Sequence, residues 1–456
     1  MNRPVVVIGG GFAGMAAACR LADAGYRPIV FEQAPRLGGR AGSFVDRGSG
    51  QTIDDGVHVL MRCCEASLGF LQRIRAVDWL SLQDPLSIPI RFPGGEITLR
   101  SAPLPGMLHL LPSLLSYRPL DRGQRIGAAR AALRLRLARH TGDETAAVWL
   151  TRHGQPSAAL ERLWNPISVA ALNAPIDAVD ATSLQTVLRR AFLRPGGADM
   201  GFFQAPLATV FDRARTYVEE REGEVRAGLG VRQLLFDESG AASGVVTTSG
   251  EIVSVRAVVS AVPPQDAVRL FDEARHVPEA VMNAAANLMW SPIVNVHLWF
   301  DRPVFRGGYA MTVGSPVQAI FDVAWLHQRE EGSAPAGQHL VLSQSAADSL
   351  ANQPAQAIVE RLLSSLAQLL PDAQAASCVR SLVVTRPRAT FVPAPGHQRW
   401  RPGGASGIAR FVLAGDWTST GWPSTIESAV RSGIVAAARV EGLLEPDENV
   451  DEGGSE

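Results

Sequence analysis

The chain has 456 residues, of which 46% are hydrophobic, and a formal net charge of -1 at neutral pH. Its length predicts two or three domains with a sizeable core, and its balanced charge gives no reason to expect nucleic acid as a partner. All 43 basic residues are arginine, which excludes a lysine Schiff base, a phosphate-binding lysine and a lysine general base.

An apolar run at residues 4–8 predicts a first strand that is buried on both faces. A glycine-rich loop follows at once, then a helical pattern that ends near Ala24, and then a second strand at residues 28–31, which Glu32 closes. Strand, glycine loop, helix, strand and acid in this order predict a dinucleotide-binding βαβ unit.

The glycine loop contains the pattern G-x-G-x-x-G as Gly9, Gly11 and Gly14. Gly9 allows a tight turn, Gly11 lets a pyrophosphate approach the backbone, and Gly14 lets the helix pack close to the sheet. The helix N-terminus offers unpaired N–H groups to phosphate, and Glu32 can accept hydrogen bonds from ribose hydroxyls. This unit by itself does not separate FAD from NAD.

Two further segments bear on the cofactor. Residues 36–41 read RLGGRA, so paired glycines allow close backbone approach and Arg40 can meet phosphate. Near the other end, an apolar strand at 411–414 delivers Gly415 and Asp416. A helical stretch follows at 424–433, whose N-terminus can stabilise the negative charge of a reduced flavin. By spacing alone, this late segment could also be one more βα unit.

Both segments resemble the FAD signatures of the flavin amine oxidase and carotenoid (phytoene) desaturase superfamily. Longer strings resemble the hydroxysqualene dehydroxylases, also called squalene-associated FAD-dependent desaturases: LWNPISVAALN at 163–173, SPIVNVHLWFDRP at 291–303, RATF at 388–391 and AGDWTSTGWPSTIE at 414–427. The likeness extends to about residue 442. It implies FAD as the cofactor, with contacts from Gly9, Gly11, Gly14, Glu32, Arg40, Val231, Gly415 and Asp416.

The resemblance also implies a reaction, the reduction of hydroxysqualene to squalene with loss of water, and hence a long-chain C30 isoprenoid substrate. It does not indicate the electron donor. The alternative is a phytoene-type desaturase, with the same cofactor and the opposite direction of hydride flow. A third possibility is a scaffold that binds FAD without turnover. Amine oxidation is disfavoured, because the amine oxidases of this superfamily place a lysine near the flavin.

The motif DDGVH at residues 54–58 departs from the family pattern Asp-Asn-Gly-Gln-His, because Val57 stands at the Gln position. Loss of a hydroxyl as water requires a proton, and Asp55 and His58 are the predicted catalytic residues because each can donate one when protonated. The structural alternatives are that Asp54 or Asp55 caps a turn and that His58 belongs to the core. For His297, in an alternating strand pattern, packing is favoured over a place in the substrate cavity.

The scattered histidines and four cysteines show no metal-ligand spacing, so no metal is expected. We predict an α/β fold with a Rossmann-like FAD-binding domain built from discontinuous segments and an inserted α+β substrate domain. The middle FAD segment includes a small antiparallel piece with turns at Gly240 and Gly250. The predicted ranges are 1–75, 205–268 and 405–442 for the FAD-binding domain, 76–204 and 269–404 for the substrate domain, and 443–456 for a disordered acidic tail.

Residues 105–115 are apolar but broken by proline, and residues 118–139 carry seven arginines among Ala, Leu and Ile. An apolar segment beside a basic amphipathic helix is typical of an interfacial membrane anchor. The alternative is a core helix with a solvated arginine face. Because no secretory signal or disulfide framework is evident, we expect a cytoplasmic protein, peripheral on the inner face of the bacterial membrane.

Overall fold

The computed structural model describes residues 3–139, 143–272, 277–327 and 337–444. Of the predicted acidic tail, Leu443 and Leu444 end a helix and the rest lies outside the described residues. The predicted βαβ unit is present as β1 (Val5–Ile8), α1 (Phe12–Asp23) and β2 (Pro28–Glu32).

The five-stranded parallel sheet has the strand order β10-β2-β1-β14-β20. The three further strands are β10 (Glu224–Ala227), β14 (Ala257–Ser260) and β20 (Phe411–Leu413). Early, middle and late parts of the chain therefore meet in one sheet. The predicted α/β fold, with a Rossmann-like sheet built from discontinuous segments, is confirmed.

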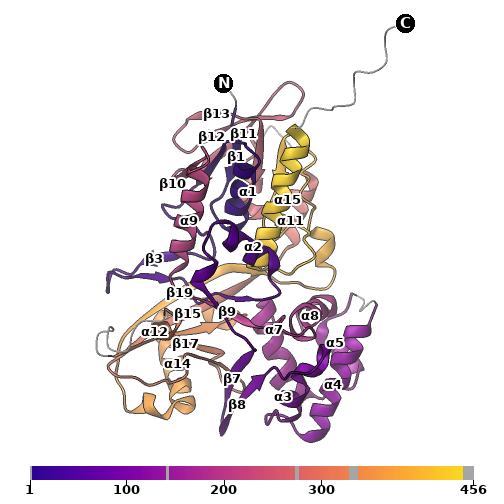
Figure 1. Ribbon diagram of the computed structural model, residues 1–456, viewed down its shortest axis with the longest axis vertical. Coiled ribbons are helices and arrows are strands. Elements are labelled where there is room, and N and C mark those ends of the chain that lie inside the picture. The colour runs from indigo at the N-terminus through magenta and orange to yellow at the C-terminus, as the bar shows by residue number, and fades with distance from the viewer. Residues whose placement is uncertain (1–2, 140–142, 273–276, 328–336, 445–456) are drawn as a thin grey trace.

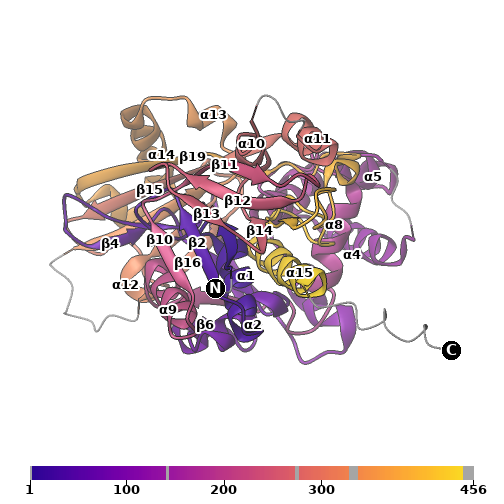
Figure 2. The same cartoon turned by 90° about the horizontal axis from the view of Figure 1, so that it is seen from above.

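The two faces of this sheet are covered by different elements (Figures 1 and 2). Val5 and Val7 face α1, α9 (Leu207–Glu219) and α15 (Ile426–Leu444). Val6 and Ile8 face the opposite side, where a small antiparallel sheet packs. That sheet has the predicted turns at Gly240 and Gly250, both with positive φ. Its strands are β11 (Val231–Phe236), β12 (Ala242–Thr247) and β13 (Ile252–Ser254), and α10 (Pro264–Val268) and α11 (Glu279–Asn287) lie on the same side.

The lower part of Figure 1 contains a seven-stranded mixed sheet in the order β19-β15-β18-β17-β16-β7-β8. Helix α14 (Ala355–Leu369) packs on one of its faces and forms a separate core with it. The strands are β7 (Ser87–Phe92), β8 (Gly95–Arg100), β15 (Trp290–Phe300), β16 (Tyr309–Thr312), β17 (Ala319–Asp322), β18 (Gln338–Gln344) and β19 (Cys378–Phe391). The short helices α12 (Val323–Leu326) and α13 (Asp348–Ala351) join these strands.

Beside this sheet lies a group of helices, purple in Figure 1. Helix α4 begins after Asp121, whose carboxylate accepts from the Gln124 N–H in a capping box. The helix therefore begins at Arg122, within the arginine-rich segment 118–139. The group comprises α3 (Leu111–Leu115), α4 (Arg122–Leu137), α5 (Ala146–Arg152), α6 (Ser157–Ala159), α7 (Asn165–Leu172) and α8 (Ala181–Val187).

Shorter elements connect the upper and lower parts of the molecule. They are the hairpin β3 (Ser43–Val45) and β4 (Thr52–Asp54), the sheet of β5 (Val59–Met61), β6 (Leu80–Leu82) and β9 (Met200–Phe203), and helix α2 (Glu65–Arg73). We propose that the two parts are the FAD-binding and substrate domains with the boundaries predicted from the sequence. Within the described ranges, no helix is both long and apolar enough to cross a bilayer.

Candidate active site

A single cavity of about 1990 Å³ extends from the carboxyl ends of β1 and β2 to the helices α3, α4 and α7. Pockets that hold one small ligand measure roughly 300–1,000 Å³. This cavity therefore has room for a cofactor and a second molecule in contact with it. Its two ends are lined by different kinds of residue, polar loops at the sheet and aliphatic side chains at the helices.

The glycine loop after β1 borders the first end of the cavity. Gly9 has φ of +104°, a conformation that favours glycine. At Gly11 a Cβ would project toward the second glycine loop, where its nearest neighbour is the Gly38 carbonyl oxygen at 3.7 Å. Gly14 does not line the cavity; a Cβ there would lie 1.9 Å from the Gly9 carbonyl oxygen, so its absence lets α1 pack on the turn.

Glu32 lines the cavity at the end of β2, as predicted. Its carboxylate accepts hydrogen bonds from the backbone N–H groups of Gly10 and Ala34, each at 2.8 Å. These bonds fix the carboxylate beside the glycine loop, where it can meet ribose hydroxyls. Val231, at the start of β11, lines the same end of the cavity.

Arg40 and Asp416 form an ion pair across the cavity wall. Arg40 also donates to the Ala389 carbonyl oxygen at 3.1 Å, and the Ser424 hydroxyl donates to Asp416. Burial opposes ionisation of Asp416, but the Arg40 charge and the hydrogen bonds from Arg40 and Ser424 outweigh it and lower the pKa of this carboxyl. The preceding Gly415, with φ of +128°, also lines the cavity.

These residues fit a bound FAD. Gly9 and Gly11 line the cavity at the N-terminus of α1, Arg40 supplies positive charge for phosphate, and Glu32 and Asp416 supply acceptors for hydroxyl groups. All the predicted FAD contacts except Gly14 line one cavity.

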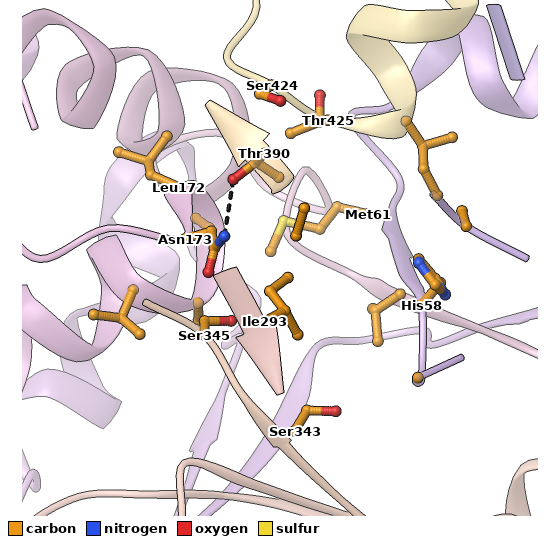
Figure 3. A pocket seen from close by; sticks show the side chains of 18 of the residues that line it. His58, Met61, Leu172, Asn173, Ile293, Ser343, Ser345, Thr390, Ser424 and Thr425 are labelled. Carbon is orange, nitrogen blue, oxygen red and sulfur yellow. Dashed lines mark hydrogen bonds between the residues drawn. The ribbon is translucent and has the colours of Figure 1, made fainter. Parts of the chain in front are cut away.

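Figure 3 shows polar side chains around the cavity, those of His58, Asn173, Ser343, Ser345 and Thr390, among the apolar side chains of Met61, Leu172 and Ile293. Asn173, with φ of +51°, uses its whole amide: Nδ2 donates to Thr390 Oγ1 at 2.9 Å and to the Ser291 carbonyl oxygen at 3.2 Å, and Oδ1 accepts from the Ala346 N–H at 2.6 Å. It thus joins the end of α7 to the sheet.

His58 and Asn295 both line this cavity. The Nδ1 atom of His58 has no hydrogen-bond partner among the described residues. Burial lowers the pKa of His58, so the neutral imidazole predominates at neutral pH. Asn295 Oδ1 accepts from the Ser343 hydroxyl at 2.7 Å, while its Nδ2 lies against Gly56, where a Cβ would come within 2.1 Å. Gly56 therefore makes room for the Asn295 amide.

The two adjacent aspartates have different surroundings. Asp55 is 2% exposed and forms an ion pair with Arg386, with Arg36 Nη2 at 3.9 Å. Asp54 instead accepts from the Leu207 N–H at 2.9 Å, at the N-terminus of α9, and from the Ser43 hydroxyl. The cap alternative considered for this motif thus describes Asp54, whereas Asp55 lines the cavity in an ion pair.

Other candidates lie away from the cavity or were missed. His297 does not line it; its Nδ1 is 3.1 Å from His339 Nε2 and its ring stacks on Trp299, as the packing interpretation predicts. Asn295 and Arg386 were not predicted. Arg386 lies two residues before the RATF string, but no sequence pattern indicates its pairing with Asp55, 331 residues away.

The Rossmann-like sheet, the glycine loop and the Glu32 carboxylate define a dinucleotide-binding protein, and the family match that follows makes it a flavoprotein oxidoreductase with FAD as its cofactor. The chain belongs to the flavin-containing amine oxidoreductase family, whose model matches residues 12–441.

Similar proteins include enzymes of isoprenoid metabolism. The chain is 27% identical to hydroxysqualene dehydroxylase of Sinorhizobium fredii, over 96% of this chain and 98% of that one. It is 23% identical to 15-cis-phytoene desaturase of Synechococcus elongatus, over 96% and 95% of the two chains. Among solved structures, a putrescine oxidase superposes with a TM-score of 0.71 at 17% identity, covering 97% of this chain and 99% of that one, which supports the fold.

Proposed function

We propose that the protein reduces hydroxysqualene to squalene with loss of water. The observation that carries the proposal is that one cavity joins a long aliphatic arm to the polar side chains of His58 and Asn295. A C30 chain matches the aliphatic arm, and its hydroxyl group matches the polar groups.

The aliphatic arm is lined by residues of the helical group, including Leu111, Leu114, Leu163, Ile167 and Leu172. Burial of a hydrocarbon against such side chains is favourable by roughly 25 cal/mol per Å². A substrate hydroxyl can form hydrogen bonds with the His58 and Asn295 side chains that line the cavity, whereas a pure hydrocarbon cannot. This difference favours an isoprenoid alcohol.

The bound FAD, when reduced, supplies the hydride that replaces the hydroxyl group. The protein supplies the proton with which the hydroxyl leaves as water, and His58 is the proposed donor. Burial and the Arg386 charge disfavour its imidazolium form, while the Asp55 charge favours it. We therefore assign Asp55 a supporting role: its ion pair with Arg386 holds both charges beside His58.

The alternative function is a phytoene-type desaturase. The relatives that include phytoene and zeta-carotene desaturases favour it, since they match the chain over a similar length. Such an enzyme would use the aliphatic arm in the same way but would pass hydride from substrate to flavin. The polar groups in the cavity would then face a substrate without oxygen.

The test supplies each substrate, without oxygen, with protein in the redox state that its reaction requires. Reduced protein is mixed with hydroxysqualene and oxidised protein with phytoene, and the organic extracts are analysed. Squalene from the first mixture, with phytoene unchanged in the second, supports the proposal. Desaturated phytoene without any squalene would replace it with the alternative.

We also propose that the cavity opens toward a membrane. The segment from Leu104 to Leu137 carries exposed leucines. Three of them, Leu108, Leu115 and Leu133, also line the cavity. Helix α4 also carries five arginines, of which Arg130 lies at the cavity wall. Exposed leucines with arginines beside them suit a surface of anionic lipid. The protein would then be cytoplasmic and peripheral on the inner face of the membrane.

A further inference from the structure

Arg401 is a buried arginine directly behind the FAD end of the cavity. It follows a short 3₁₀ turn (His397–Trp400) and its side chain is 4% exposed. The guanidinium donates to three backbone carbonyl oxygens, those of Asp416 at 2.9 Å, Thr418 at 2.6 Å and Trp422 at 2.7 Å. It also lies 3.4 Å from the Ser428 hydroxyl oxygen.

The positive charge of Arg401 is balanced by carboxylates that do not contact its guanidinium directly. No carboxylate of the described residues accepts a hydrogen bond from its guanidinium, and its Nε has no partner. Burial lowers the pKa of Arg401 to about 10, while the charges of Asp416 and Asp180 act in the other direction. The residue is therefore charged at neutral pH. A buried cation is costly, and an apolar side chain of similar size would fill the space at less cost.

The bonded oxygens belong to two adjoining parts of the cavity wall. Asp416 lines the cavity at the start of the loop after β20. Ser428 lies in the first turn of α15, two residues after Ile426, which also lines the cavity. The Ser432 hydroxyl accepts from the Gly415 N–H at 2.8 Å and ties the loop to the helix a second time. The guanidinium thus fixes, from outside the cavity, the positions of Asp416 and of the helix N-terminus.

We propose that Arg401 is a positioning residue for the FAD, which holds the loop 415–422 against the N-terminus of α15 and places a buried positive charge behind the wall that they form. The hydrogen bonds determine how Asp416 meets the cofactor. The charge favours the reduced cofactor, because reduction adds negative charge to the flavin. This inference concerns the cofactor alone and does not depend on the proposed substrate.

Two variants separate the hydrogen bonds from the charge. Arg401→Met removes both, whereas Arg401→Lys keeps the charge but its single ammonium cannot span three separate carbonyl oxygens. The control is Arg399→Met, an exposed arginine two residues away that lies over the Trp400 ring. For each protein, apoprotein is titrated with FAD to obtain Kd, the midpoint potential of the bound flavin is measured, and the apoprotein Tm is recorded.

We expect Arg401→Met, which removes the charge and all three hydrogen bonds to the carbonyl oxygens, to weaken FAD binding by about 10- to 100-fold and to lower the midpoint potential. Arg401→Lys should weaken binding but keep most of the potential, and Arg399→Met should match the wild type in both. If Arg401→Met lowers only the apoprotein Tm and leaves Kd and potential at control values, Arg401 is a stability residue and the proposal is wrong.

If Arg401→Met does not fold, Arg401→Lys and Ser428→Ala decide the matter. Ser428→Ala removes one acceptor from the α15 side and leaves the guanidinium in place. We expect a several-fold weaker FAD affinity in the folded variant. Unchanged FAD affinity in both variants would overturn the proposal.

Discussion

Gly14 shows how one missing side chain supports the cofactor site without touching it. A Cβ at this position would lie 1.9 Å from the Gly9 carbonyl oxygen, so Gly14→Ala must push α1 away from the glycine turn. Overpacking of this kind costs about 1–3 kcal/mol or more. We predict a lower Tm and purified protein with substoichiometric FAD.

The control for this variant is Gly69→Ala. Gly69 lies within α2, and a Cβ there meets no atom within 4 Å. Because alanine is the better helix former, this change should raise stability by about 0.5–1 kcal/mol and leave FAD content unchanged. Full FAD occupancy in Gly14→Ala would show that the close packing of α1 is not needed.

Asp54 makes stability depend on pH. Burial raises its pKa from 3.8 to about 6, against the hydrogen bonds from Ser43 and Leu207. The native state therefore binds more protons than the unfolded state between about pH 4 and 6, and the stability that Asp54 contributes falls as pH rises through this window. Asp54→Asn can accept the same two hydrogen bonds and cannot ionise.

We expect Asp54→Asn to match the wild type near pH 4 and to exceed it at pH 7 by roughly 2–3 kcal/mol, since one pKa unit corresponds to about 1.4 kcal/mol. Thermal unfolding of both proteins across this range measures the difference. A difference that stays constant with pH would mean that Asp54 is already ionised in the native protein at pH 4.

His58 is the residue on which the proposed chemistry depends. General acid catalysis by a positioned side chain contributes about 10²–10⁴-fold, so His58→Gln should lower the rate of substrate reduction by at least about 100-fold. Because burial lowers the pKa of His58, the wild-type rate should rise toward acidic pH, and the variant should lose this rise. His153→Gln, a change outside the cavity, should retain the wild-type rate and pH profile. An unchanged rate in His58→Gln would remove it as the acid.

For single residues, the sequence predicts a functional role where the local backbone geometry requires a particular residue type. Gly9, Gly11 and Glu32 are readable because a turn, a close approach and a strand end each demand a residue type at a fixed spacing. The roles of Arg386 and Asn295 cannot be predicted from the sequence, because their partners, Asp55 and Gly56, come near them only in the folded protein. Arg401, with its carbonyl partners, belongs to the same group.

The proposed contact with the membrane can be tested by a substitution in helix α4. Leu137 is 68% exposed on this helix and does not line the cavity, whereas Ile252, equally exposed, lies on β13 in the other half of the molecule. Leu137→Glu should reduce co-sedimentation with vesicles that contain anionic lipid, and Ile252→Glu should not. Equal binding by both variants, or no binding by the wild type, would contradict the contact.

The elements themselves were predictable where periodicity or glycine marks them. The βαβ unit and the antiparallel β11–β13 piece follow the predicted pattern. A helix lies within the arginine-rich segment 118–139 as predicted, and the Asp121 capping box, rather than the run of arginines, sets its start at Arg122. The parallel pairing of β7 with β16 lay beyond sequence analysis, since more than 200 residues separate the two strands.

For the whole molecule, the central feature is that one cavity joins the cofactor loops to an aliphatic arm between helices. The sheet that carries the cofactor loops uses strands from three separated parts of the chain, and the arm uses the parts inserted between them. The sequence indicated this arrangement through motifs at both ends of the chain. It could not give the shape of the cavity, which arises from side chains that meet only in the folded protein.

The most direct test of the account is a single turnover without oxygen. Protein whose FAD has been fully reduced is mixed with excess hydroxysqualene, and flavin absorbance and extracted squalene are followed together. We predict that the flavin returns to its oxidised spectrum with one squalene formed for each flavin reoxidised. If the flavin stays reduced and no squalene forms while FAD remains bound, the proposed function is wrong.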